Sequence, residues 1–266
     1  MHYNNTEKYD FPEIDTVLKS YVICSVPRSG STLLCRGLWD SGIAGAPKEY
    51  FNNKHMGDLY SRWHPKNTHE YIGLLKKFRT SPNGIFGFKA HYDQFCRIYN
   101  ELNIRSVFPN LRYIFVLRKD HVKQAISLSK AMQTNQWTSD DKVERIPEYD
   151  YHDIKQQLQY IKNQEEAWKI FFIRENIHPL RIIYEEFIEN YEKTISTVFN
   201  HLTVQIPPTF IIATPKLKKI ADTTNHFWFE RFKNDQAIQK YNLTRIFSSR
   251  NIRLAILKST FNRRKI

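Results

Sequence analysis

The sequence predicts an α/β protein with a P-loop-like, three-layer fold, in which helices flank a central parallel sheet. Four short apolar runs are rich in β-branched and aromatic residues, which is typical of buried strands. Each run is followed by a segment with helical periodicity. Strands that alternate with helices form parallel sheets covered on both faces. Ligands of such sheets bind beyond the carboxyl ends of the strands, so the loops there are the places to look for function.

The elements follow from these runs in chain order. The expected strands are Tyr21 to Ser25, Gly84 to Ala90, Leu111 to Leu117 and Leu180 to Tyr184. Between the first two, Asn52 to Arg79 is partly helical and rich in aromatic residues, so it forms either a lid over the site or a packing layer. Thr138 to Tyr149 is polar and acidic, which predicts an excursion between two helices.

Length and composition point to one domain. We expect residues 1–266 to form a single domain, because 266 residues suffice for one large core. No apolar run reaches the roughly 18 residues of a membrane span, and the N-terminal residues lack a signal-peptide pattern. Cys24, Cys35 and Cys96 are widely spaced without a CxxC pair, so neither a disulfide framework nor a metal site is implied. A cytoplasmic protein is expected.

The charge is strongly basic and unevenly distributed. The formal net charge is +13, and the residues from 216 onward hold thirteen Lys or Arg against three acids. Such a patch can bind nucleic acid, attract a polyanionic nucleotide, or form the solvated face of a helix. Charge alone does not decide among these functions.

The most informative motif follows the first expected strand. That strand breaks at Pro27, and an amphipathic helix begins a few residues later. Backbone N–H groups at a helix N-terminus, together with hydroxyls and a basic side chain, bind anions. The expected anion ligands are Arg28, Ser29, Gly30, Ser31 and Thr32. The alternative is an ordinary helix start with a Ser or Thr cap.

The loop is not a Walker A motif. GxxxxGK[ST] requires a first glycine and a lysine that are both missing here, which argues against an ATPase or kinase. The run instead resembles the 5′-phosphosulfate-binding loop of sulfotransferases. With Gly42 to Phe51, it is most similar to bacterial enzymes that use 3′-phosphoadenosine 5′-phosphosulfate (PAPS) and are related to trehalose 2-sulfotransferase. Further similar motifs, in the expected order up to about Asp235, are Ser81 to Lys89, Val116 to Ser127, Gln133-Thr134 with Trp137, Tyr184 to Glu186, and Ala221-Asp222.

The resemblance implies a PAPS-dependent sulfotransferase acting on a hydroxyl group, with a carbohydrate or glycolipid as the expected acceptor. It implies that Arg118 and Ser127 hold the 3′-phosphate, and a bidentate guanidinium with a hydroxyl suits a dianionic phosphate. Alternatively, Arg118 pairs with Asp120, and Ser127 lies on a helix surface. Lys219 occupies a basic position in a segment similar to the loop that closes over the nucleotide in this family. Trp228 is either an aromatic neighbour of that loop or a core residue.

The resemblance also supplies the catalytic residues. Glu49 falls on the family's general base, and a carboxylate in a partly dry cleft can take a proton from the acceptor hydroxyl. His91 is a competing base, because eukaryotic-type sulfotransferases carry Lys-x-His at a comparable strand end. Lys89 is expected to stabilise charge on the leaving oxygen, or else to form an ion pair at the pocket rim. Ala46 stands where the trehalose-specific relative has an acid, which puts trehalose itself in question.

The aromatic side chains near the presumed cleft are of a kind that suits sugar rings; they are Tyr50, Phe51, Tyr60 and Trp63. The family analogy also implies a homodimer, with PAPS or its product 3′-phosphoadenosine 5′-phosphate (PAP) as ligand and no nucleic-acid partner. Two rival functions stay open at this point. One is a nucleotide kinase-like phosphoryl transferase on a related fold, and the other is a non-catalytic nucleic-acid binder that uses the basic C-terminal region.

Overall fold

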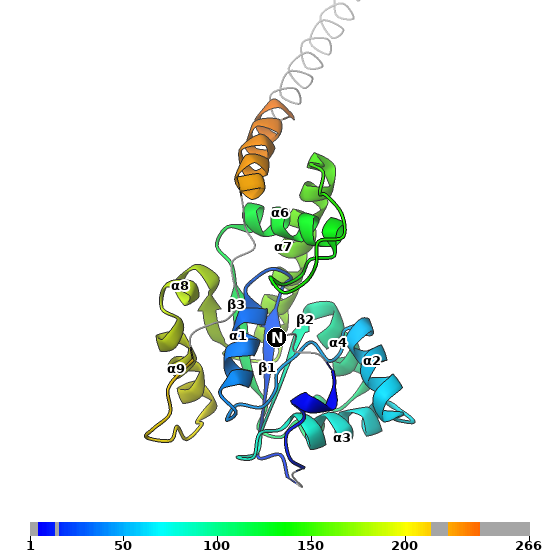
Figure 1. The fold of residues 1–266 in the computed structure, drawn as a ribbon, viewed down its shortest axis with the longest axis vertical. Coiled ribbons are helices and arrows are strands. Elements are labelled where there is room, and N and C mark those ends of the chain that lie inside the picture. The colour runs from blue at the N-terminus through cyan, green and yellow to red at the C-terminus, as the bar shows by residue number, and fades with distance from the viewer. Residues whose placement is uncertain (1–4, 14–15, 214–222, 240–266) are drawn as a thin grey trace, which may run out of the picture.

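A four-stranded parallel sheet forms the centre of the protein (Figure 1). The computed structural model describes residues 5–13, 16–213 and 223–239. The strands are β1 (Lys19–Ser25), β2 (Ile85–His91), β3 (Arg112–Leu117) and β4 (Leu180–Ile183), in the order β2-β1-β3-β4. All four expected strands are confirmed with small shifts at their ends. β1 and β2 are almost wholly buried, as parallel strands covered on both faces should be.

Helices cover the two faces and confirm the three-layer α/β fold. One face packs against α1 (Ser31–Asp40), α8 (Tyr184–Glu189) and α9 (Tyr191–Leu202). The other face is covered by α2 (Asn53–Trp63), α3 (Thr68–Arg79), α4 (Tyr92–Glu101), α5 (Ile104–Val107), α6 (His121–Thr134) and α7 (Tyr151–Arg174). A short 3-10 helix, η1, spans Glu7–Tyr9. Figure 1 shows α8 and α9 on one side of the sheet and α2, α3 and α4 on the other.

Alternation along β1 divides the core between these faces. Tyr21 and Ile23 point to the α1 side, whereas Val22 and Cys24 point to the α4 and α7 side. On that second side Trp168 of α7 is fully buried, and its Nε1 donates a hydrogen bond to the Ser25 carbonyl at 3.1 Å. The end of β1, from which the anion loop departs, is therefore tied to the longest helix.

Residues 45–48 lie along β2, which is at one edge of the sheet. The Lys89 N–H donates to the Lys48 carbonyl at 2.9 Å, and the Ala46 N–H donates to the Arg79 carbonyl at 3.0 Å. These bonds place Glu49 beside the carboxyl end of β2. The following helices α2 and α3 bury Leu59, Tyr71, Ile72 and Leu75 in the core, so this segment is a packing layer rather than a lid.

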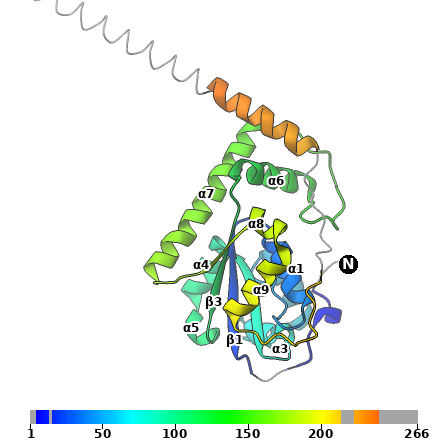
Figure 2. The same ribbon diagram turned by 90° about the vertical axis from the view of Figure 1, so that its left-hand side faces the viewer.

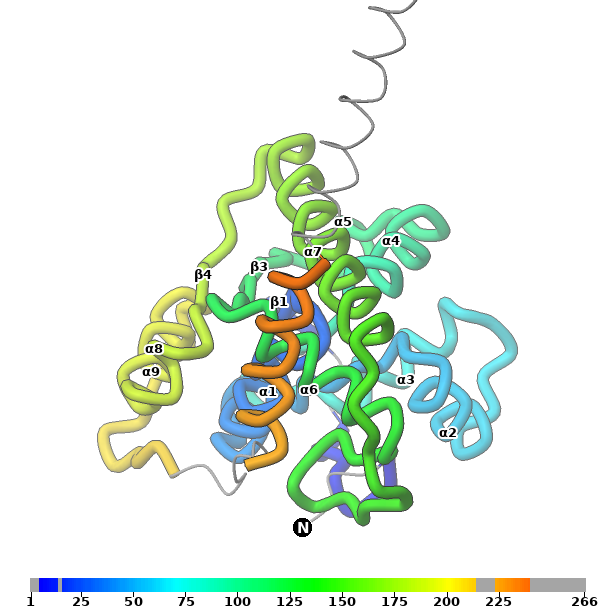
Figure 3. The backbone as a smooth tube through the Cα atoms, turned by 90° about the horizontal axis from the view of Figure 1, so that it is seen from above, coloured from blue at the N-terminus to red at the C-terminus, as the bar shows by residue number. Residues whose placement is uncertain are grey.

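The upper part of the molecule consists of α6, the upper end of α7 and a helix over residues 223–239 (Figures 2 and 3). The 223–239 helix contacts α6, where Lys130 Nζ donates to Asn225 Oδ1 at 2.8 Å. Its Trp228 is 3% exposed and belongs to the core, as its structural reading predicted. Residues 135–150 join α6 to α7 without a helix or strand, which confirms the expected excursion. None of the described helices is long and apolar enough to span a membrane.

Candidate active site

The predicted anion loop connects β1 to α1. The helix cap is Gly30 in a left-handed conformation at φ 87°, with no side-chain cap, so the expected alternative of a Ser or Thr cap is wrong. A Cβ at Gly30 would lie 2.3 Å from Cδ2 of Tyr184, so both the conformation and the space require glycine. Ser29 is fully buried, and its Oγ has no hydrogen-bond partner in the described part of the protein. Uncapped N–H groups and an unpaired hydroxyl are what an anion-binding loop presents.

The second set of predicted anion ligands, Arg118 and Ser127, contacts this loop. Arg28 Nε donates to Ser127 Oγ at 2.9 Å, and Arg118 donates to the Arg28 carbonyl at 3.3 Å. Burial and the neighbouring Arg118 guanidinium lower the pKa of Arg28 to about 10. Two cations held this close repel each other, and a bound phosphate or sulfate would relieve that repulsion. Both predicted halves of the anion site therefore meet at one place.

The Arg118 side chain contacts α8 rather than its sequence neighbour Asp120. Its guanidinium lies 4.9 Å from the ring centroid of Tyr184, and its Nε is 3.8 Å from Glu185 Oε1. Asp120 instead caps α6 by accepting from the Lys123 N–H at 2.9 Å. The expected alternative, an Arg118–Asp120 pair, is therefore wrong. Arg118 Nε makes no hydrogen bond to the described residues.

Glu49, Lys89 and His91 form the third part of the site. Lys89 Nζ is 2.6 Å from Glu49 Oε2, and His91 Nε2 is 3.6 Å from the same oxygen. Lys89 Nζ also donates to Thr32 Oγ1 at 3.5 Å, so it bridges the anion loop and the predicted base. All three side chains are largely buried. The two candidate bases and the candidate cation thus share one small volume at the carboxyl ends of β1 and β2.

Charge interactions decide the protonation states there. Burial tends to raise the pKa of Glu49, but Lys89 and, less strongly, His91 outweigh burial and hold that pKa well below its usual range. Burial tends to lower the pKa of Lys89, but Glu49 raises it on balance. Burial lowers the pKa of His91 despite Glu49. At neutral pH, Glu49 is therefore a carboxylate, Lys89 is charged and His91 is neutral.

His91 contacts Ser25 through one ring nitrogen and Glu49 through the other. Its Nδ1 lies 3.2 Å from the Ser25 carbonyl oxygen, which can only accept. Nδ1 also lies 3.2 Å from the Ser25 hydroxyl oxygen, which can donate to it, and Nε2 lies 3.6 Å from Glu49 Oε2.

Two amides that the sequence analysis did not single out complete the surroundings of Glu49. Gln94 Nε2 donates to Glu49 Oε1 at 2.7 Å, and Asn52 Nδ2 donates to the same oxygen at 3.2 Å. The available signals were local ones, namely the N-cap position of Asn52 and the capping-box spacing from His91 to Gln94.

The expected aromatic contacts to an acceptor need correction. Tyr50 and Phe51 are fully buried in the core, because their rings fill the space between α3 and the sheet. Trp63 stacks on Phe78 with ring centroids 5.4 Å apart, and Tyr60 packs on Tyr71. The Ala46 side chain is also fully buried. Lys219, the remaining predicted site residue, lies outside the described residues.

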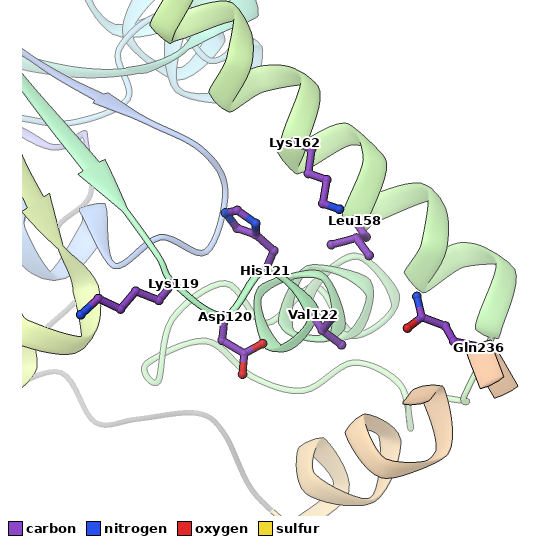
Figure 4. A pocket seen from close by; sticks show the side chains of 7 residues that line it. All are labelled: Lys119, Asp120, His121, Val122, Leu158, Lys162 and Gln236. Atoms are coloured by element: carbon purple, nitrogen blue, oxygen red, sulfur yellow. The ribbon is translucent and has the colours of Figure 1, made fainter. Parts of the chain in front are cut away.

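A small cavity adjoins the site, and a larger hollow lies apart from it. A space of about 20 Å³ touches Arg28 and Ser127, which is room for one water molecule. A larger, open hollow of about 590 Å³ lies between the β3–α6 turn, α7 and the 223–239 helix (Figure 4). It is lined by Lys119, Asp120, His121, Val122, Leu158, Lys162 and Gln236. None of the predicted site residues lines it, so the larger hollow is separate from the Glu49 centre.

The chain is similar to several known proteins. Trehalose 2-sulfotransferase of Mycolicibacterium smegmatis is 26% identical over 256 residues, which covers 81% of this chain and 95% of the relative. The trehalose 2-sulfotransferase of Mycobacterium tuberculosis is 25% identical with the same coverage. Among solved structures, the sulfotransferase domain of the Synechococcus PCC 7002 olefin synthase has a TM-score of 0.46 and 13% identity, covering 88% of this chain and 98% of that one.

The family model described as Stf0 sulphotransferase matches residues 20–235. This span contains both predicted anion-binding segments and the Glu49 centre, and it covers most of the sequence. The kinase-like and nucleic-acid-binding functions that remained open are not those of this family. The chain therefore belongs to the Stf0 sulphotransferase family and is a sulfotransferase.

Proposed function

We propose that this sulfotransferase moves the sulfuryl group of PAPS to a hydroxyl group of a carbohydrate or glycolipid. The family implies PAPS as the donor, and both relatives named above are trehalose 2-sulfotransferases. The observation that carries the proposal is the position of Lys89, which contacts Thr32 in the anion loop at 3.5 Å and Glu49 at 2.6 Å. One side chain thereby links the expected leaving group to the expected base.

The residues present fit a phosphosulfate donor. The buried Ser29 hydroxyl and the first N–H groups of α1 would bind the 5′-phosphosulfate. Arg118 Nε and Ser127 would bind the 3′-phosphate, and this would add an anion between two guanidinium groups that otherwise repel each other. Arg28 would release the Ser127 hydroxyl when the phosphate binds, because the cavity beside that bond is small.

PAPS supplies an activated sulfuryl group whose bond to the bridging phosphate oxygen breaks. Glu49 removes the proton from the acceptor hydroxyl while that oxygen bonds to sulfur. Lys89 donates to the bridging oxygen as it takes up the electron pair of the broken bond. Lys89 must turn from Glu49 toward Thr32 to do so. Its departure removes the main charge that lowers the pKa of Glu49, so the carboxylate becomes a stronger base when the leaving group is engaged.

Two experiments test this function. PAP should raise the melting temperature more than ADP or AMP at equal concentration, because only PAP has a 3′-phosphate for Arg118 and Ser127. Labelled PAPS should then transfer label to at least one member of a panel of trehalose, other oligosaccharides and glycolipids, and Glu49→Gln should slow the transfer by roughly 10² to 10⁴. Equal stabilisation by PAP and ADP would contradict the donor assignment, and label found only on non-carbohydrate hydroxyls would contradict the acceptor class.

The proposal also includes a single domain over residues 1–266 and a homodimer. Limited proteolysis followed by mass spectrometry tests the first, and sedimentation equilibrium tests the second.

A further inference from the structure

Two helices, α2 and α4, begin beside Glu49, and an amide side chain at each start contacts the carboxylate. Asn52 is the N-cap of α2, where its Oδ1 accepts from the Lys54 N–H at 3.0 Å. Gln94 lies in the first turn of α4, where its Oε1 accepts from the His91 N–H at 3.2 Å. The nitrogen of each amide donates to Oε1 of Glu49.

The direction of both amides is determined by their helix-start bonds. A backbone N–H can only donate, so the amide oxygen must face it. The NH₂ group of each amide must then face Glu49. Oε1 of Glu49 consequently accepts two N–H bonds from groups that cannot accept a proton in return. Oε2 has different neighbours, the Lys89 ammonium at 2.6 Å and His91 Nε2 at 3.6 Å.

We propose that Gln94, assisted by Asn52, is a positioning residue that keeps Oε1 of Glu49 as a hydrogen-bond acceptor and thereby assigns proton transfer to Oε2. The inference rests on the proposed role of Glu49 as the base. A proton on Oε1 would point at an amide N–H and break one of the two hydrogen bonds. Once Lys89 turns to the leaving oxygen, Oε2 has a free lone pair. The acceptor proton passes to Oε2, which still has His91 Nε2 as a neighbour at 3.6 Å.

Replacing each amide by the acid of the same shape distinguishes a role in positioning Glu49 from a role in capping the helix. Gln94→Glu and Asn52→Asp keep an oxygen for the helix-start N–H bonds but replace the NH₂ donor with a second carboxylate oxygen. Two neighbouring carboxylates share a proton, so Glu49 should take up a proton at higher pH. The other titratable groups facing Glu49 are unchanged; they are Lys89 and His91 of β2, Cys35 of α1, His55 of α2 and Tyr160 of α7.

A matched control exists on α7. Gln157 Nε2 donates to Asp153 Oδ1 at 2.9 Å, which is the same kind of amide–carboxylate bond outside the site. Gln157→Glu should therefore leave Glu49 unaffected. Gln94→Met removes the donor without adding a carboxyl group, so a change seen in both Gln94 variants does not come from titration of the new side chain.

The decisive measurement is an infrared pH titration of the PAP-bound protein, with the Glu49 carboxyl band identified by its loss in Glu49→Gln. We expect this band to appear at a pH higher by about one to two units in Gln94→Glu and Gln94→Met. The shift should be smaller in Asn52→Asp, whose bond is longer, and absent in Gln157→Glu. An unchanged midpoint in Gln94→Glu, with a native circular dichroism spectrum, overturns the inference even if Gln94→Met fails to fold.

The pH profile of single-turnover sulfation separates this inference from the proposed function. If wild type transfers sulfate, the acid limb of the pH–rate profile should lie at higher pH in the variants than in wild type. The variants should follow the same order as in the infrared titration. If wild type sulfates no acceptor but the infrared shift is present, Gln94 still positions the carboxylate and the proposed function is wrong. If wild type is active and neither the band nor the acid limb moves, the inference alone is wrong.

Discussion

Arg118 offers the sharpest test of the donor site, because its expected effect on nucleotide binding can be worked out from its contacts. Arg118→Ala removes one hydrogen bond to the Arg28 carbonyl, a loose pair with Glu185 and a contact with the Tyr184 ring. Its Nε, which makes no hydrogen bond to the described residues, is the group available to a 3′-phosphate. A hydrogen bond to a charged group contributes about 1.5 to 3 kcal/mol.

The net loss of binding free energy for PAP in Arg118→Ala should lie near the lower end of that range. Removing Arg118 also removes its repulsion of Arg28, whose pKa it helps to lower. A loss of about 1.5 to 2 kcal/mol corresponds to a Kd for PAP that is roughly 10- to 30-fold higher. ADP has no 3′-phosphate, so its Kd should change by less than about threefold.

Isothermal titration calorimetry with PAP and ADP measures both effects. Arg105→Ala is a suitable control, since Arg105 is exposed and its Nη2 lies 3.6 Å from Glu175, away from the site. Circular dichroism must stay native in each variant. If Arg118→Ala lowers the affinities for PAP and ADP equally, Arg118 does not bind the 3′-phosphate and its assignment is wrong.

The remaining predictions concern the base, the loop and the N-terminal segment. Glu49→Gln should lower single-turnover sulfation by roughly 10² to 10⁴ with little change in PAP affinity, and His91→Asn should do less; the reverse order would make His91 the base. The stability advantage of wild type over Glu49→Gln should be complete above about pH 5 and shrink below about pH 4, because the folded-state pKa of Glu49 is depressed; urea titrations that show no pH dependence would contradict this. Gly30→Ala should weaken PAP binding at least tenfold by calorimetry, since the added methyl meets the Tyr184 ring; unchanged affinity would show that the loop tolerates a side chain. Asp10→Asn should lower the free energy of unfolding by about 3 to 5 kcal/mol, because it leaves the fully buried Arg79 without its carboxylate; a loss below about 1 kcal/mol would show that the pair is effectively hydrated.

The strands and the anion loop could be predicted because their signals are local. A continuous apolar run followed by Pro27 and Arg28 to Thr32 indicates a strand, a loop and a helix from sequence alone. The order of strands in the sheet could not be deduced in this way. It depends on which faces pack together, and the sequence does not state that β1 lies between β2 and β3.

The sequence named the residues of the candidate site but not their contacts. Glu49, Lys89 and His91 were all named from the sequence. However, Lys89 and His91 approach the same carboxylate oxygen of Glu49 only through the tertiary structure. Arg118 lies beside Glu185, just beyond the neighbouring strand β4, rather than pairing with Asp120 two positions away, because Asp120 caps α6. The burial of aromatic rings after Glu49 was also misjudged, since composition does not reveal which side of a chain faces the core.

The attachment of residues 45–48 to β2 has a consequence for solubility. An exposed edge strand offers unpaired backbone groups to other chains and is a site of aggregation. Here the chain segment that leads into Glu49 covers that edge, with the Lys89 N–H donating to the Lys48 carbonyl and Gly45 lying against the backbone of β2. The segment thus covers the edge strand β2 and also positions Glu49. Variants that loosen it, for example to admit bulkier acceptors, should be expected to lose colloidal stability before they lose their fold.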